Sequence, residues 1–433
     1  MKVLPIRPAR PAPAVPAAPA DARWRWARLL TAPHRLGFFS AAVLLAVGAL
    51  WWALVLATRA AGIALPWAVP PPVAHGLLMG LGAMPLFIVG FLFTAGPRWL
   101  GLPDVPAPVL RRPVVLMLAG WALALPGFHL ATEVAAAGLG LVALGWGALV
   151  WRFLRLLRAS RVADRLHATL VALGCGVGVG ALVLATLGLA LPLVQLTRAA
   201  TQLALWCFLA ATFAVVSHRM IPFFTASALP ALAAWRPNAL LWTLLGLLWL
   251  EGAGAAAEAW LGTLPTGPRW AQALVEAPAA LLLLGVAWRW GLVLSLRIRL
   301  LAMLHAGFLW LGIALALAAS SHAALAASEG AWSLGLAPTH ALTMGYLGTT
   351  LIAMITRVAA GHSGRALAAD NLAWSLYWAV CAATVLRVAA AIWPDATDVL
   401  TLGAVALWCV GCVGWAWRYG GWLGRPRIDG RPG

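Results

Sequence analysis

The sequence predicts an all-α polytopic membrane protein with about twelve transmembrane helices and both termini in the cytoplasm. Of its 433 residues, 63% are hydrophobic and only 10% are charged, whereas soluble proteins carry about 25% charged residues. Long apolar runs recur roughly every 30 residues, and each could cross a hydrocarbon core about 30 Å thick as a helix. The short alternating segments of a transmembrane β-barrel are absent from the sequence.

The expected spans follow one another closely, and the third and fourth are short and nearly contiguous. Their predicted ranges are 37–58, 73–95, 114–131, 133–151, 168–190, 198–217, 239–257, 272–294, 301–319, 337–359, 371–392 and 398–417. Because no loop is long enough to bury a core, we expect one membrane domain, 36–419, and no soluble domain. Residues 1–35, rich in Pro, Ala and Arg, are expected to be a disordered cytoplasmic tail rather than a signal peptide. Residues 420–433 form a short basic cytoplasmic tail.

The net charge of +18 is explained by topology and does not indicate a nucleic acid partner. Most basic residues lie before the first span, in every second loop or after the last span, whereas the other loops carry only Arg59, Arg198 and Arg269. The positive-inside rule therefore places both termini in the cytoplasm. The same topology puts His75, His129, His322 and His340 near the outer face.

The leading candidate site is a pair of histidines at the outer ends of the second and tenth spans. Both span starts read H-x-x-x-M-G, with His75, Met79, Gly80 in one and His340, Met344, Gly345 in the other. Methionine at i+4 shares a helix face with the histidine, and glycine admits a bulky group close to the backbone. Two imidazoles at equal depth on facing helices suit the axial ligation of one haem iron. The alternative is that each histidine bonds to a carbonyl at the membrane interface.

Arg387 lies about five residues inside the eleventh span, where a cation is costly and usually paired. Haem propionates are natural partners for arginine, and the acidic residues of the outer half, Glu251, Glu258 and Glu276, are rival partners. Glu251 also suits a proton path, although a single acid does not establish one.

Three histidines near the cytoplasmic face form a second candidate site. His340 and His362 are about 33 Å apart along a continuous helix, so they cannot bind the same atom. We expect His218, His305 and His362 to converge on a metal, either copper or the iron of a second haem. The alternative is that His218 and His362 are solvated helix ends.

Five motifs in order along the chain resemble the signatures of the NnrS family, from about residue 34 to Tyr419. They are "GFLFTAGPRWLG", "HRMIPFFT", "LHAGFLWLG", "HALTMGYLGTTLIAMITRVAAGHSGR" and "VLRV" around Arg387. The resemblance implies a twelve-helix protein of the bacterial inner membrane that contains haem, expected here to be b-type, and copper. It also implies a role in the nitric oxide response of denitrifying bacteria, with nitric oxide or a related small molecule as ligand.

The chain departs from the family pattern at the start of the second span. The family commonly shows W-H-x-H-E-M, whereas Val73 stands here for the first histidine and Gly76 for the glutamate. The resemblance therefore supports haem more directly than copper.

Three functional hypotheses follow from these observations. The first is an NnrS-like haem protein of nitric oxide response or resistance, with a bis-histidine haem between the second and tenth spans. The second is a cofactor-free transporter in which His75, His340, Glu251 and Arg387 line a proton or solute path. The third is an assembly protein without a site of its own. The sequence does not distinguish an enzyme from a sensor or a transporter.

Overall fold

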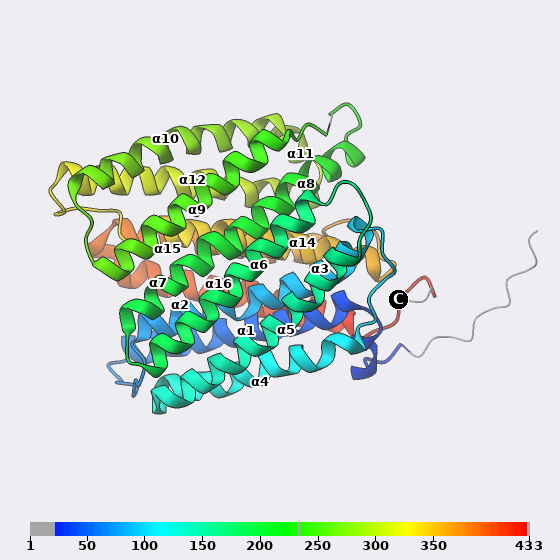
Figure 1. Ribbon diagram of the computed structural model, residues 1–433, viewed down its shortest axis with the longest axis horizontal. Coiled ribbons are helices and arrows are strands. Elements are labelled where there is room, and N and C mark those ends of the chain that lie inside the picture. The colour runs from blue at the N-terminus through cyan, green and yellow to red at the C-terminus, as the bar shows by residue number, and fades with distance from the viewer. Residues whose placement is uncertain (1–21, 233, 431–433) are drawn as a thin grey trace, which may run out of the picture.

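The computed structural model describes residues 22–232 and 234–430, and these form helices without strands (Figure 1). Twelve helices are long and apolar enough to cross a membrane, which confirms the predicted fold class and each predicted span. The spans are α1 (Pro33–Ala60), α2 and α3 (Pro71–Leu81, Ala83–Trp99), α4 (Pro108–Leu130), α5 (Thr132–Ala159), α6 (Leu166–Ala190), α7, η2 and α8 (Val194–Leu203, Ala204–Ala210, Ala211–Ala228), α9 (Asn238–Leu261), α10 (Thr266–Arg289), α12 (Arg299–Ala327), α13, η3 and α14 (Ala337–His340, Ala341–Gly348, Thr349–His362), α15 (Asn371–Ile392) and α16 (Thr397–Leu423). The short elements are η1 (Trp26–Leu30), α11 (Leu292–Ser295) and η4 (Pro394–Ala396).

The two ends of the described chain lie together at one end of the bundle. The backbone N–H of Arg25 donates to the carbonyl of Gly424 at 2.9 Å, and the guanidinium of Arg35 donates to the carbonyls of Leu423 and Arg425 at 2.8 and 2.7 Å. An even number of spans requires this arrangement. It places both described ends on one side of the membrane.

The boundary predicted for the N-terminal tail needs a correction. Residues 1–21 of the predicted tail lie outside the described residues. The later part is helical, because η1 forms at Trp26 and α1 begins at Pro33, where proline suits the first turn of a helix. Arg35 is therefore buried between the two chain ends rather than part of a tail.

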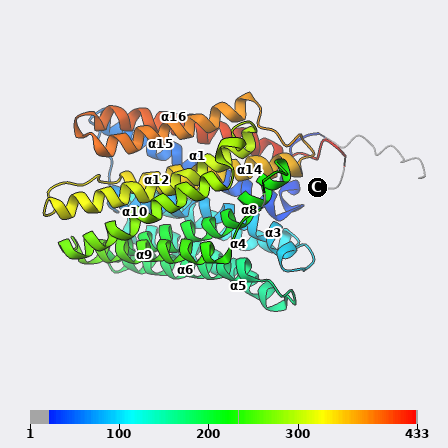
Figure 2. The same cartoon turned by 90° about the horizontal axis from the view of Figure 1, so that it is seen from above.

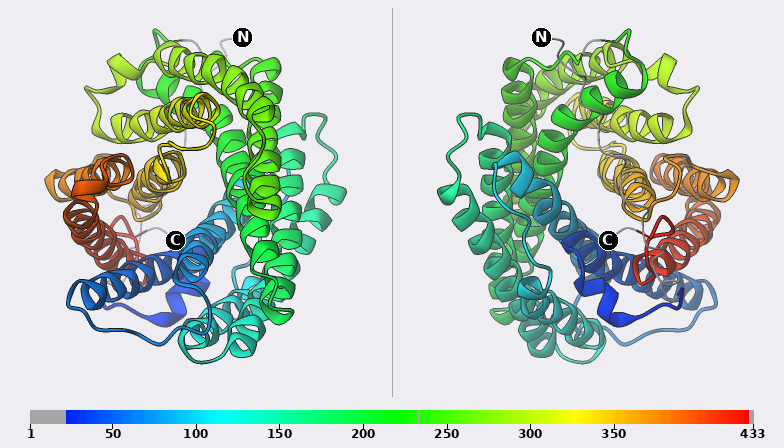
Figure 3. Two further views of the ribbon diagram at one scale, coloured as in Figure 1. Left: turned by 90° about the vertical axis from the view of Figure 1, so that its left-hand side faces the viewer. Right: turned by 90° about the vertical axis from the view of Figure 1, so that its right-hand side faces the viewer.

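Three spans, the second, sixth and tenth, form the centre of the bundle. They are 89%, 83% and 78% buried within the protein, whereas no other span exceeds 67%. Seen along the helices, the remaining spans surround them (Figure 3), and the ring closes where α1 packs against α16 (Figure 2). The second, sixth and tenth spans are therefore shielded from lipid by the others.

Each of these three inner spans is interrupted. The second is broken at Gly82, between α2 and α3, whereas the sixth and tenth contain the π-helical segments η2 and η3. The segment η2 contacts both α2 and η3. Because π-helical turns often occur at functional sites, the three interruptions mark the region where a site is expected.

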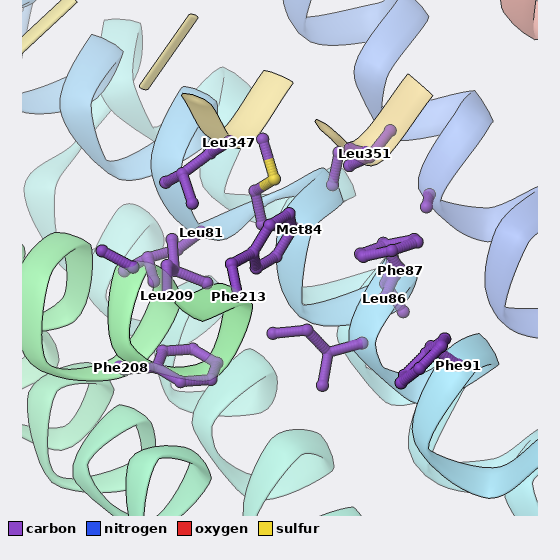
Figure 4. Close-up of a cluster of buried hydrophobic side chains, with 14 of the residues drawn as sticks. Leu81, Met84, Leu86, Phe87, Phe91, Phe208, Leu209, Phe213, Leu347 and Leu351 are labelled. Atoms are coloured by element: carbon purple, nitrogen blue, oxygen red, sulfur yellow. The ribbon is translucent and has the colours of Figure 1, made fainter. Parts of the chain in front are cut away.

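Apolar side chains from the inner spans fill the centre of the molecule (Figure 4). The second span supplies Met84 and Phe87, the sixth supplies Phe213, and the tenth supplies Leu347 and Leu351, all of them buried. Beside this cluster the same three spans, with α6 and α12, line a small cavity that has room for a molecule the size of water.

Candidate functional site

His75 lies near the start of α2, at the end of the bundle opposite the described chain ends. We call this end the outer end and the other the inner end. Two prolines open this helix at positions that lack an intrahelical partner for the N–H. The imidazole stacks on Trp52 of α1, with ring centroids 4.0 Å apart. Its Nδ1 is buried without a hydrogen-bond partner. A buried, unpaired imidazole nitrogen is costly, so this atom is suited to hold a ligand.

His340 is the last residue of α13 and directly precedes the π-helical segment η3. Its Nδ1–H donates to the carbonyl of Leu336 at 2.9 Å. This bond fixes the tautomer, because the remaining nitrogen, Nε2, must then carry the lone pair. Metal-bound histidines commonly have their second ring nitrogen held by a carbonyl in this way. His340 is therefore oriented as a ligand would be.

Arg387 of α15 completes the group at this end of the bundle. Arg387, His75 and His340 lie within electrostatic range of one another. Among the described residues, Arg387 forms no ion pair. The structure thus brings together two imidazoles and a cation with no carboxylate, an arrangement suited to a metal-containing ligand with anionic groups.

The methionines and glycines of the two H-x-x-x-M-G motifs lie beside these histidines. Met79 and Met344 are half-buried. Gly80 faces Leu205 and Gly345 faces the Trp310 indole, at 3.0 and 2.6 Å from an added Cβ. The close approach that these glycines permit is therefore made by neighbouring helices, and their contact with a cofactor stays a prediction.

The three inner-end histidines predicted to converge on one metal do not come together. Nε2–H of His218 donates to the carbonyl of Pro237, and Nδ1 of the same ring accepts from His167, each at 3.1 Å. His218 therefore has no lone pair left for a metal. Nε2 of His305 bonds to Thr225 at 2.9 Å.

The His362 ring instead contacts the His34 ring in a tilted arrangement, with ring centroids 4.2 Å apart. Within the described part of the chain, no three His, Cys, Asp or Glu side chains are grouped as for a metal ion. The sequence does not indicate these partners, because His34 lies within the predicted tail, 1–35, and His167 lies just before the predicted span 168–190.

Two of the three acids considered as partners for Arg387 contact other groups, and Glu258 forms no ion pair with Arg387 among the described residues. Glu276 accepts from Nδ1 of His322 through both carboxylate oxygens, at 2.7 and 2.9 Å. Glu251 is hydrogen-bonded to Glu276. An external anion such as a haem propionate therefore stays the predicted partner of Arg387.

The comparison with known families covers nearly the whole chain. The model of the NnrS family, described as NnrS protein, matches residues 28–427. No curated protein matches the chain.

Proposed function

The chain belongs to the NnrS family, and on that premise we propose that it is a haem-binding membrane protein of the nitric oxide response. His75 and His340 would hold the iron of a b-type haem, and Arg387 would bind a propionate. The observation that carries the proposal is the group itself: a buried imidazole nitrogen without a partner, an imidazole held by a carbonyl, and a cation without a carboxylate.

The residues of the chain would orient the haem and limit its ligands. The Leu336 carbonyl holds the His340 ring in place, and Trp52 packs against the His75 ring. A haem supplies an iron that can bind nitric oxide or exchange an electron.

The family resemblance is the only support for a copper cofactor in this protein. The three inner-end histidines are separated, and Val73 and Gly76 replace two polar residues of the family pattern. We therefore propose haem as the cofactor, and metal analysis of the purified protein decides whether copper accompanies it.

A cofactor-free transporter is the second candidate, because the inner spans are interrupted. Transporters bind substrates where helices are broken near the membrane centre, and α2–α3, η2 and η3 provide such breaks. In this case the half-buried His75 and Arg387 would line a polar path rather than hold a cofactor.

The absorption spectrum of the purified protein separates the two candidates. Protein from an aerobic expression host should be red, with Soret and α bands, and should bind about one haem per chain. Colourless protein that also fails to take up added haem would contradict the haem proposal and favour the transporter.

We also propose that the protein resides in the bacterial inner membrane with both termini in the cytoplasm. The asymmetric distribution of arginine supports this orientation. Reporter domains fused to either end should both be active only as cytoplasmic reporters. A reporter active outside the cytoplasm at either terminus would contradict the proposed orientation.

A further inference from the structure

A second polar cluster lies among α9, α10 and α12, which pack side by side in the outer ring (Figure 1). It consists of Glu251 of α9, Glu276 of α10 and His322 of α12. The glutamates are only 7% and 1% exposed, and the His322 side chain is 16% exposed. Intramembrane carboxyl groups of this kind are expensive and usually have a function.

The contacts within the cluster require a proton. Glu251 and Glu276 are hydrogen-bonded to each other, and two ionised carboxylates can only accept, so one of them must carry a hydrogen. Two carboxylates in hydrogen-bonding contact do not both ionise in a low-dielectric site. A neutral Glu251 beside an ion pair of Glu276 and His322 would leave the cluster without net charge.

The surrounding groups do not replace that proton with another cation. On α10, Arg269 is buried two turns before Glu276, and its Nε has no partner. The Gln272 amide lies over Gly254 of α9, and its Oε1 is buried without a partner.

Three further polar groups lie on the same helices or on a neighbouring one. The Cys207 thiol lies against Gly252, Ser321 of α12 accepts from the N–H of Leu334, and Glu258 lies two turns after Glu251. No described group of three ligating side chains suits a metal. The proton is the ligand that fits.

We propose that Glu251, Glu276 and His322 form a proton-binding site that exchanges its proton with the outer surface. This site is separate from the pair His75 and His340 and does not depend on haem. His322 is the partly exposed member and lies near the outer end of α12, so it connects the buried acids to water.

The transfer conserves charge at each step. From the neutral state, Nδ1 of protonated His322 gives its proton to Glu276, which breaks an N–H bond, forms an O–H bond and leaves two neutral acids beside a neutral ring. The two acids exchange their protons, and Glu276 returns one of them to Nδ1. The ring then flips and releases that proton to water, which leaves Glu251 protonated and Glu276 ionised, and a proton from water reloads the ring. His322 is suited to this role because each ring nitrogen can donate or accept.

Infrared spectroscopy of the full chain in nanodiscs tests the proposal. The wild type at neutral pH should show the C=O band of a protonated carboxylic acid that shifts in D2O. Glu251→Gln should remove the band. The matched control Glu258→Gln, two turns away on the same helix, should retain it. A wild type without the band would overturn the proposal, because the acids would then be fully ionised.

The rate of deuterium exchange tests the route. In His322→Gln the band should persist while its exchange slows by roughly a hundredfold, the lower range for a positioned acid–base group. Unchanged exchange in this variant would refute His322 as the route. Both readouts are independent of haem content, so their failure is distinct from failure of the haem proposal.

Discussion

The histidines at the two ends of the inner spans differ in the hydrogen bonds they make. At the inner end His218 is bonded through both nitrogens, to His167 and Pro237, and His305 is bonded through Nε2 to Thr225, while Nδ1 of His305 is buried without a partner. At the outer end His75 keeps an unpaired buried nitrogen, and His340 is anchored by one nitrogen only. Whether a buried histidine can bind a ligand is thus decided by the partners its nitrogens already have.

The largest effect is expected on the haem spectrum when histidines at the outer end are replaced. His75→Ala and His340→Ala should each abolish or strongly shift the haem spectrum, because each removes a proposed axial ligand. His362→Ala and His218→Ala, the matched changes at the inner end, should leave the spectrum unchanged. Equal loss of haem from an inner-end variant, measured by absorption of the purified protein, would remove the distinction.

A smaller effect is expected from the cation at the outer end. Arg387→Gln should weaken haem retention by roughly ten- to a hundredfold, because a hydrogen bond to a charged group contributes about 1.5–3 kcal/mol. Arg387→Lys keeps the charge but lacks the paired N–H groups of arginine. Its haem retention should therefore lie between those of the wild type and Arg387→Gln. Haem transfer to an acceptor protein measures this retention. Retention as in wild type with Gln would show that Arg387 does not bind a propionate.

The glycines of the outer end should affect stability rather than haem binding. In Gly345→Ala the new Cβ would lie 2.6 Å from the Trp310 ring, and such overpacking costs about 1–3 kcal/mol. Gly76→Ala, beside His75, meets its nearest atom at 3.5 Å and serves as the control. Thermal unfolding in detergent compares the two. A haem spectrum altered by Gly345→Ala without a loss of stability would instead favour contact with the cofactor.

The smallest effect belongs to the inner end, where an exposed ion pair joins Asp370 to Arg418. Partial burial acts to raise the pKa of Asp370, but the Ala373 N–H and the Arg418 guanidinium outweigh it and lower the pKa. A lowered folded-state pKa means that the contribution is present above the unfolded value of 3.8 and is lost as pH falls through the folded-state value.

Asp370→Asn should therefore cost about 0–1 kcal/mol at neutral pH and reduce the loss of stability in acid. Asparagine preserves the cap of α15, at which the Asp370 side chain accepts from Ala373. Denaturation at several pH values checks this. A loss of unfolding free energy well above about 1 kcal/mol would show that the stability of the inner end depends on this ion pair.

The number and placement of the spans followed from the sequence alone. A helix must satisfy its backbone hydrogen bonds internally in lipid, and the bilayer sets its length. The alternation of arginine then assigned His75 and His340 to one side, and His218 and His362 to the other. The repeated H-x-x-x-M-G motif selected the pair that the structure brings together with Arg387.

Only the tertiary structure decided which spans are central and which polar groups meet. Helices facing lipid are as apolar as buried ones, so hydropathy does not distinguish the second, sixth and tenth spans from the rest. The π-helical turns η2 and η3 arise where packed helices shift a hydrogen bond. The partners His167, His34 and His322 come from distant segments, and contacts of that kind are set by helix packing rather than by spacing along the chain.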